Sequence, residues 1–435
     1  MGSVSILAGP KVKRGAKSAP TPPANAQRAF EPELLESTGF SAKLIDRFMR
    51  NPFWLMAFLR NYWPMPVIKG WGAITRYDDV AEAMQNDKAV AVPFAEKIKL
   101  LNDGPNFVLG MKDGPEYQWH HEALVAAFPL SDNAEFVAPI AREEAEHLVQ
   151  NGDGEIDAIR DLITLVPTRI CERYYGVNVP EEFEFGQWTI AMSSFMFGDP
   201  GNNPVLREVA LAASDRLRPL LDTAIANAKA GPDAPTVVSR LVKMQPDHPE
   251  MNDAVIRGML MGTITGFVPT NTMAAGHILE KLLEKPDWMA QARMAALADD
   301  DDLLKRCLFE ALRFYPINPG PFRECAEDVT IAAGTKREKT IKKGTNLMVM
   351  TQSAMFDPRR VPNPKKFDPT RKDADYMSMG FGLHWCIGAP LAFTQITQTL
   401  KPLLTRKNLR RAPGRDGRLE KLGPFPSNLV VLYDN

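Results

Sequence analysis

The sequence predicts a mainly α-helical protein with a small β part. A helical pattern begins near Glu31, and the segment 252–285 has the pattern of one long apolar helix. Short apolar or alternating runs at 329–331, 345–350 and 429–432 predict strands in the C-terminal half. These patterns place most of the chain in helices and only a few short segments in sheet.

The composition is that of an ordinary globular protein without a strong net charge. Of the 435 residues, 45% are hydrophobic and 24% are charged, which is close to the average for globular domains. The 52 Lys and Arg residues nearly balance the 53 Asp and Glu residues, giving a net charge of -1. This balance argues against a protein that binds nucleic acid or an anionic membrane through its overall charge.

The four cysteines, Cys171, Cys307, Cys325 and Cys386, are scattered without paired spacing. Their distribution argues against a disulfide framework and against a zinc site, and it favours a reducing compartment. The sequence contains no apolar run of about eighteen residues, the length that a membrane span requires. We therefore expect a cytoplasmic protein without a membrane span.

Residues 1–30 differ in composition from the rest of the chain. They are rich in Pro, Ala, Gly and Lys, which predicts a flexible N-terminal arm. A targeting segment is the alternative, but the apolar core of a secretory signal is missing. Length alone predicts about three domains for a chain of this size.

The first half of the chain contains several local signals. Residues 70–77 predict a short strand that leads into a helix capped by Asp78 or Asp79. Residues 88–112 have no sustained period and contain Pro and Gly, so they predict a long loop. The run 299–302 consists of aspartates and predicts an exposed helix cap.

The sequence Asp-Gly-Pro-Glu at 113–116 predicts the start of a helix, because proline and acidic residues favour a first turn. Tyr117 and His121 lie four residues apart and would share one face of this helix. His120 lies on a different face, where we expect it to be exposed.

The apolar segment at 255–272 predicts a buried core helix that Pro269 breaks. A proline inside a helix removes one hydrogen bond and costs about 3 kcal/mol. Such strain suggests a functional role, although a plain kink explains it equally well.

A glycine-rich loop with one cysteine occupies residues 379–392. Glycine permits close approach of the backbone, here to a flat ligand. Cys386 precedes an apolar segment compatible with a helix, whose N-terminal amides would favour a thiolate. A lone cysteine in an apolar run is more often a small buried hydrophobe, but a thiolate in this place could also bind haem iron.

The loop resembles the haem-binding signature of the cytochrome P450 family. The matching residues are Gly380, Gly382, His384, Cys386 and Gly388, followed by Leu391 and Ala392. Met379 differs, because the family has phenylalanine there. The resemblance extends roughly from residue 70 to the end. It implies a single large domain with a cytochrome P450-like fold over 31–435, and a haem b cofactor (iron protoporphyrin IX).

The resemblance also assigns roles to residues elsewhere in the chain. The expected haem-binding residues, with Cys386 as the iron ligand, are Tyr117, His121, Arg323, Met379, Gly380, Phe381, His384, Cys386, Gly388 and Ala392. The residues expected at the substrate pocket are Phe107, Phe267, Val268, Pro321 and Phe425, with Phe94 and Val108 as further candidates. Glu310, Arg313 and Arg371 would form a buried structural cluster that supports the cysteine loop.

The helix at 252–285 corresponds to the oxygen-binding helix of the family, but it departs from the usual pattern. Gly266 and Thr270 match the small residue and the alcohol, and they are the expected catalytic positions. Phe267 replaces a glycine, and Pro269 replaces the acid that normally relays protons with the alcohol. This helix therefore lacks the acidic member of the family's usual proton relay.

Three functions are compatible with this pattern. The first is a monooxygenase that hydroxylates a small apolar substrate with O2 and electrons from a ferredoxin-type partner and its reductase. The second is a hydroperoxide-using enzyme, namely a peroxygenase, isomerase or dehydratase, because such chemistry does not need the acid that Pro269 replaces. The third is a haem protein that senses or carries a ligand without turnover.

Overall fold

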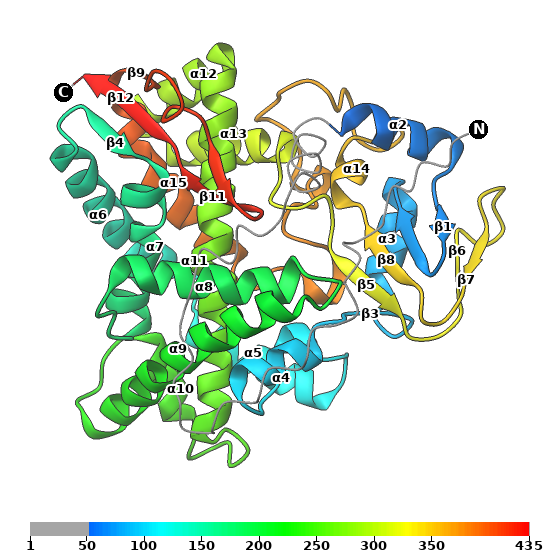
Figure 1. The fold of residues 1–435 in the computed structure, drawn as a ribbon, viewed down its shortest axis with the longest axis horizontal. Coiled ribbons are helices and arrows are strands. Elements are labelled where there is room, and N and C mark those ends of the chain that lie inside the picture. Colours follow the sequence, from blue (N-terminus) through cyan, green and yellow to red (C-terminus); the bar gives the residue numbers. More distant parts are fainter. Residues whose placement is uncertain (1–51, 435) are drawn as a thin grey trace, which may run out of the picture.

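The computed structural model describes residues 52–434, so the predicted arm at 1–30 lies outside the described residues. Figure 1 shows a large helical part on one side and a smaller part with most of the strands on the other. The long helix α11 (Asp253–Glu284) runs through the helical part and is surrounded by other helices. The prediction of a mainly helical protein with a small β part is confirmed.

The remaining helices fall into two groups by position. The helical part contains α5 (Pro115–Ala127), α6 (Ala138–Asn151), α7 (Leu165–Ile170), α8 (Glu182–Phe197), α9 (Pro204–Ala230), α10 (Val237–Met244), α12 (Pro286–Leu297), α13 (Asp301–Phe314) and α15 (Ala389–Thr405). The helices α2 (Phe53–Tyr62), α3 (Tyr77–Gln85) and α14 (Thr351–Met355) lie nearer to the strands, and α4 (Ala95–Asn102) packs against α8, α9 and α11.

Within residues 52–434, the strands form four small sheets. The largest has the order β1-β2-β8-β5-β3, in which β2 and β8 are parallel and the other pairs are antiparallel. Its strands are β1 (Val67–Ile68), β2 (Trp71–Ile74), β3 (Val90–Ala91), β5 (Phe322–Cys325) and β8 (Asn346–Val349). The others are β4 (Glu155–Asp157), β12 (Val430–Asp434) and β9 (Lys407–Arg411), the pair β6 (Val329–Ile331) and β7 (Lys339–Ile341), and the pair β10 (Glu420–Leu422) and β11 (Phe425–Asn428).

Helix α11 is continuous through Pro269, so the prediction of a broken helix is wrong. Most of its residues are buried, and neighbouring helices, including α8, α9, α13 and α15, pack around it. A helix that is apolar on all sides belongs in a protein core. The surrounding packing holds the helical path, although Pro269 has no N–H to donate to the carbonyl of Thr265.

Two local predictions in the first half are also corrected. The segment 88–112 is not one long loop, because it contains helix α4. Ile98, Leu101 and Asn102 are buried at helical spacing, but α4 is only eight residues long and too short for its period to stand out. Helix α3 begins at Tyr77 with Arg76 at its N-cap, so the aspartates that follow lie in the first turn and do not cap it.

His120 is buried rather than exposed, which corrects the expectation from helix geometry. Its side chain is 3% exposed, and its ring lies 3.8 Å from that of Trp119. Burial lowers the pKa of His120 from 6.5 to about 4, because the charged imidazolium is poorly solvated there. The unfolded chain therefore binds a proton at this site more readily than the folded protein does.

This difference predicts a loss of stability in acid. The pKa of His120 is lower in the folded protein than in the unfolded chain. The contribution of neutral His120 to the free energy of unfolding is therefore intact above pH 6.5 and is lost as the pH falls towards about 4. In His120→Gln, we expect proton uptake on unfolding in this window to fall by about one proton. The measurement is the pH dependence of urea unfolding. The exposed His147 provides the control as His147→Gln, and equal slopes for His120→Gln and the parent protein would contradict the prediction.

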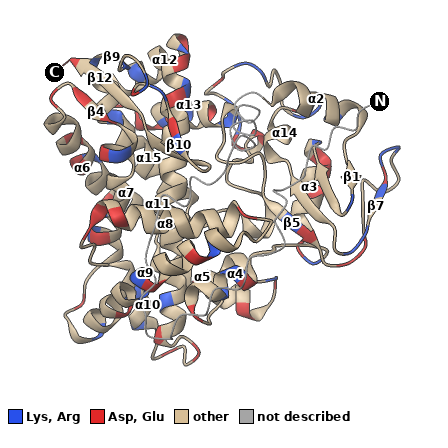
Figure 2. Ribbon diagram, viewed as in Figure 1, with Lys and Arg blue, Asp and Glu red and all other residues tan. Residues whose placement is uncertain are grey.

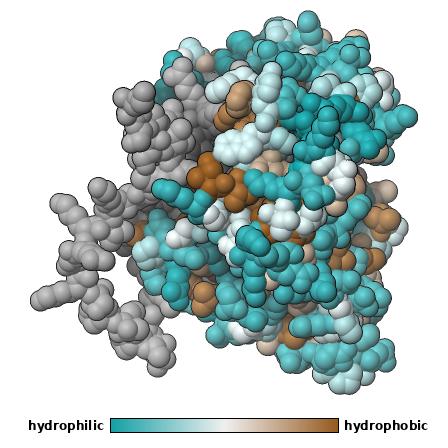
Figure 3. All heavy atoms as spheres, turned by 90° about the vertical axis from the view of Figure 1, so that its right-hand side faces the viewer, coloured by the Kyte–Doolittle hydropathy of each residue, from teal (hydrophilic) through white to brown (hydrophobic). Residues whose placement is uncertain are grey.

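Charged residues of both signs are distributed over the described part of the chain. Figure 2 shows Lys and Arg interspersed with Asp and Glu over the visible elements, as the net charge of -1 predicts. The face in Figure 3 is mainly hydrophilic, with small apolar areas. Among the described residues, no helix combines the length and hydropathy needed to cross a membrane.

Candidate active site

The cysteine loop forms a tight turn immediately before α15. The backbone N–H of Cys386 donates to the carbonyl of Met379 at 2.9 Å, which closes the loop. Gly382 has a φ of +73°, and a Cβ there would lie 2.5 Å from the carbonyl oxygen of Met84. Only glycine fits this position, because the loop passes so close to the end of α3.

Cys386 lies at the N-terminal end of α15, with its thiol facing an internal cavity. Burial raises the pKa of the Cys386 thiol above its usual value, while the backbone N–H groups of Gly388 and Ala389 donate to the sulfur and lower it. The net shift is upward, so the helix terminus alone does not produce a thiolate. A metal ion bound at the sulfur would supply the missing stabilisation.

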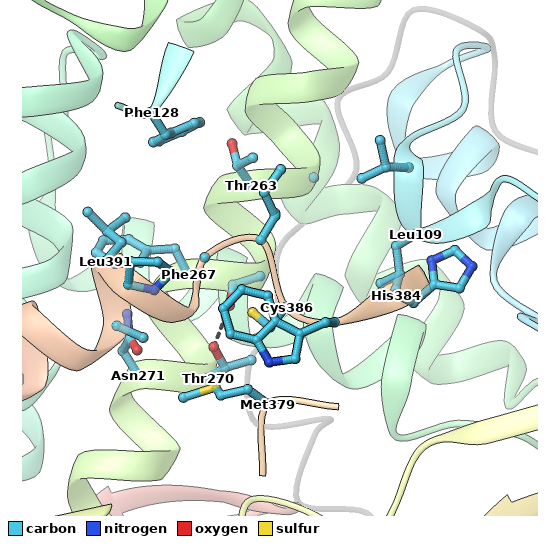
Figure 4. A pocket seen from close by; sticks show the side chains of 18 of the residues that line it. Leu109, Phe128, Thr263, Phe267, Thr270, Asn271, Met379, His384, Cys386 and Leu391 are labelled. Atoms are coloured by element: carbon cyan, nitrogen blue, oxygen red, sulfur yellow. Dashed lines mark hydrogen bonds between the residues drawn. The ribbon is translucent and has the colours of Figure 1, made fainter. Parts of the chain in front are cut away.

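The cavity has a volume of about 310 Å³ and is mainly apolar. Figure 4 shows Cys386 and residues of α11 around it. Apolar side chains from several elements line it: Phe107, Val108, Leu109, Phe128, Leu130, Met196, Phe197, Phe267, Ala274, Leu312, Ile317, Met379, Ile387, Leu391, Ala392 and Ile396. Phe107 packs against α11 because Gly262 leaves room for its ring, which a Cβ would approach to 2.5 Å.

Helix α11 contributes a small residue, a hydroxyl and an amide to the cavity wall. A Cβ added to Gly266 would meet no atom within 4 Å, so the backbone itself borders open space there. The Thr270 hydroxyl donates to the carbonyl oxygen of Gly266. Phe267 lines the cavity and packs against Tyr175, with 5.8 Å between the ring centroids.

One end of the cavity carries polar side chains. The Tyr117 hydroxyl donates to the carbonyl of Leu383 at 2.8 Å, and its ring stacks on His121. His384 Nε2 lies 3.0 Å from Asp87 Oδ1. Burial raises the pKa of Asp87, but the hydrogen bond and charge of His384 outweigh this effect and hold the pKa below its usual value.

Arg323 is a buried cation near this polar end. Its side chain is 4% exposed, and the structure shows no carboxylate within ion-pair distance of it among residues 52–434. Burial lowers the pKa of Arg323 to about 10, and the charge of Asp87 opposes this effect. A buried guanidinium without an ion-pair partner is suited to an anionic group of a ligand.

A buried network supports the loop from behind. Arg313 donates to both carboxylate oxygens of Glu310, from Nε at 2.9 Å and from Nη2 at 2.7 Å, and both side chains are 0% exposed. Arg371 Nε donates to Glu310 Oε1 at 3.1 Å. The Tyr376 hydroxyl donates to Glu310 Oε2 at 2.8 Å. The two arginines also donate to backbone carbonyls of 355–366, so they fix the segment that precedes the loop.

Most of the residues predicted for the site border the cavity. They are Phe107, Tyr117, His121, Gly266, Phe267, Thr270, Met379, His384, Cys386, Gly388 and Ala392. Gly380 and Phe381 belong to the same loop but are not among its lining residues, and Phe94 is buried away from it.

Three predicted pocket residues do not line the cavity. Val268 is rotated by about 100° from Phe267 around α11 and is buried in the core at 0% exposure. Pro321 lies beside β5, where its carbonyl accepts from Val349. Phe425 begins β11, which packs on α11, and is buried at 3% exposure. A motif gives the order of residues but not the direction in which each side chain points.

Several residues at the site were not predicted from the sequence. Asp87 lies 297 residues before His384, which it contacts, and Tyr376 reaches Glu310 from a segment without regular structure. Asn271, Tyr175 and Met196 border the cavity from helical segments. Asn271 could have been noticed, because it is a polar residue beside Thr270 in an apolar helix.

The family model for cytochrome P450 matches residues 232–424, which include α11, the Glu310 network and the cysteine loop. The chain is a cytochrome P450. The P450 is 29% identical over 290 residues to the cytochrome P450 monooxygenase PikC of Streptomyces venezuelae, and the match covers 65% of each chain. It is 25% identical over 358 residues to the vitamin D(3) 25-hydroxylase of Pseudonocardia autotrophica, with 79% of this chain and 83% of that one covered.

The fold agrees with solved P450 structures. The haem domain of the Tepidiphilus thermophilus P450 superposes with a TM-score of 0.75 at 19% identity, covering 94% of this chain and 97% of that chain. The protein therefore has the P450 fold, with one large, mainly helical domain. It is an oxidoreductase of the haem-thiolate monooxygenase class, as the names of its curated relatives indicate.

The residues at the site fit a haem group. Cys386 offers a soft sulfur ligand at the cavity wall. Arg323 offers a buried cation for a haem carboxylate, and Tyr117, His121 and His384 lie at the polar end of the cavity. The bare backbone at Gly266 leaves space on the helix wall.

Proposed function

We propose that this P450 hydroxylates an apolar C–H bond of a small organic substrate. The reaction would use O2, two protons and two electrons, and it would release the alcohol and one molecule of water. The electrons would come from a separate ferredoxin-type partner and its reductase. The observation that carries the proposal is a mainly apolar cavity bordered both by the Cys386 thiol and by Gly266 and Thr270 of α11.

We assign the cofactor as haem b, with Cys386 as the iron ligand. When bound, thiolate-ligated haem supplies the activation of O2 and the oxidation of the C–H bond. Tyr117, His121, His384 and Arg323 would hold its carboxylates. Cys386 is the only cysteine among the described residues that borders the cavity, which supports its assignment as ligand.

The chain's own residues would orient the substrate and supply protons. Apolar rings such as Phe107 and Phe267 exclude water and favour an apolar substrate. The Thr270 hydroxyl would hold a proton at Oγ1. The curated relatives named as mycinamicin IV hydroxylase/epoxidase and vitamin D(3) 25-hydroxylase support hydroxylation of an organic molecule.

The hydroperoxide-using enzyme is the second candidate. Pro269 favours it, because α11 presents no acidic side chain to the cavity and a hydroperoxide already carries the oxygen and the two electrons. In that reaction a substrate and a hydroperoxide would give two alcohols, without O2 or a reductant.

Two parallel assays of the holoenzyme separate these functions. The first supplies O2, NADPH and a surrogate ferredoxin with its reductase. The second is anaerobic and supplies a fatty-acid hydroperoxide without reductant. Both contain dodecanoic acid, a monoterpene or a steroid as the probe substrate. We expect hydroxylated probe in the first assay. Rapid multiple turnover in the second assay alone would replace the proposal with the hydroperoxide reaction.

Thr270→Val should uncouple electron use from hydroxylation. Valine keeps the shape of the side chain but removes the hydroxyl that donates to Gly266. Positioned acids contribute about 10²-fold or more to proton transfer, so we expect product per NADPH to fall by at least about tenfold, with hydrogen peroxide released instead. The control is Thr272→Val, whose hydroxyl donates to Val268 away from the cavity. Unchanged coupling in Thr270→Val would contradict this role.

A further inference from the structure

Asn271 is a polar side chain in an unusual environment. It follows Thr270 on α11, is 3% exposed and borders the cavity. Its Nδ2 atom has no hydrogen-bond partner among residues 52–434. Buried side-chain donors are nearly always paired, so an unpaired one requires an explanation.

The residues that would hold the carboxylates of a bound haem lie away from Asn271. Tyr117, His121 and His384 mark the polar end of the cavity, and Figure 4 shows His384 and Asn271 on opposite sides of Cys386. Phe267 and Leu391 border the cavity near Asn271 and offer no acceptor. An ordered water is the remaining partner of suitable size. Such a water needs at least one further polar group to hydrogen-bond with.

Thr270 supplies that second group. Its hydroxyl hydrogen is directed at the carbonyl of Gly266, which leaves the lone pairs of Oγ1 free to accept a hydrogen bond. A water between the two residues could accept from Asn271 Nδ2 and donate to Thr270 Oγ1. All three hydrogen bonds would then point in one direction, from Asn271 through the water and Thr270 to Gly266.

We propose that Asn271 is a positioning residue that holds a proton-donating water beside Thr270. It would take the place of the acidic side chain that Pro269 excludes. This proposal rests on the proposed O2-dependent function. When Thr270 releases its hydroxyl proton into the cavity, the held water donates a proton to Thr270 Oγ1. A further water then donates a proton to the held water. The amide only holds the water and is itself neither protonated nor consumed.

The first test is direct observation of the water. A high-resolution crystal structure of the holoenzyme should show a water within hydrogen-bond distance of both Asn271 Nδ2 and Thr270 Oγ1. Asn271→Leu keeps the size of the side chain and should lose this water. An empty site in the parent protein, or a water kept in Asn271→Leu, would overturn the proposal.

The second test detects the hydrogen-bonding group without turnover. The infrared C–O stretch of the ferrous carbon monoxide complex reports hydrogen-bond donors within the cavity, and we expect it to shift to higher wavenumber in Asn271→Leu.

The third test measures turnover. In the O2 assay, product per NADPH should fall about fivefold, as for the loss of one hydrogen bond, and the solvent deuterium isotope effect should change. A purely structural role would not change the isotope effect.

The matched control is Thr265→Val. Thr265 is a buried residue of α11 whose Oγ1 also has no hydrogen-bond partner among the described residues, but it does not border the cavity. This variant should retain the parent's C–O stretch and coupling.

A parent-like C–O stretch and coupling in Asn271→Leu would overturn the role of Asn271, even where the parent hydroxylates its probe. Hydroperoxide turnover alone would overturn the proposed function, while the crystal structure and the C–O stretch would still decide whether Asn271 holds the water.

Discussion

Replacing Cys386 by serine is expected to abolish both the thiolate-type ferrous–CO absorption band and O2-dependent hydroxylation. The hydroxyl of serine is a harder and less electron-rich ligand than a thiolate, so a bound haem would lose the electron donation that favours O2 activation. The Cys386 sulfur also accepts from the N–H groups of Gly388 and Ala389, and serine can accept from the same donors. The loop should therefore keep its shape while the chemistry is lost.

The measurement is the reduced, CO-bound absorption spectrum, together with haem content and product formation. Cys307→Ser is the matched control, because Cys307 is buried in α13 and does not border the cavity. The control should retain the red-shifted band. A Cys386→Ser protein that kept this band would show that another residue ligates the iron, and the assignment of the site would be wrong.

Replacing Glu310 by glutamine is expected to cause the largest loss of stability. Glu310 is completely buried and accepts from Arg313, Arg371 and Tyr376. Glutamine keeps the shape but removes the charge that balances two buried guanidinium groups. Removing one partner of a buried ion pair typically costs about 3–5 kcal/mol. Because both arginines also hold the backbone before the cysteine loop, we expect the variant to bind haem poorly.

Urea unfolding followed by circular dichroism, and haem content after purification, measure these effects. Lys342→Gln removes an ion pair with Asp328 that lies on the surface, and it should unfold like the parent protein. Parent-like unfolding of Glu310→Gln would mean that the arginines do not need the carboxylate, and their support of the loop would then rest on the backbone hydrogen bonds alone.

Residues that act through local chemistry were predictable from the sequence. The glycines of the cysteine loop, Cys386 and the Glu310–Arg313 pair occupy short motifs, and each motif has the geometry expected of it. Strands β6, β8 and β12 also lie where their apolar runs predicted them. Such features depend on neighbours within a few residues in sequence, so their pattern is visible without the fold.

Features that depend on packing between distant segments were decided by the tertiary structure. Pro269 predicts a broken helix, but the burial of α11 on all sides keeps it continuous. Helix geometry alone predicted an exposed His120, but packing between distant segments buries it beside Trp119. Asp87 reaches His384 from almost three hundred residues away.

The sequence by itself therefore indicated the family, predicted Cys386 as the iron ligand, and showed that no acidic residue precedes Thr270. Only the tertiary structure decided which side chains border the cavity, as Val268, Pro321 and Phe425 show by lying outside it and Asn271 by lying within it. The physical reason is that a motif specifies the order of residues. The direction of a side chain and its hydrogen-bond partners depend on every element that packs around it.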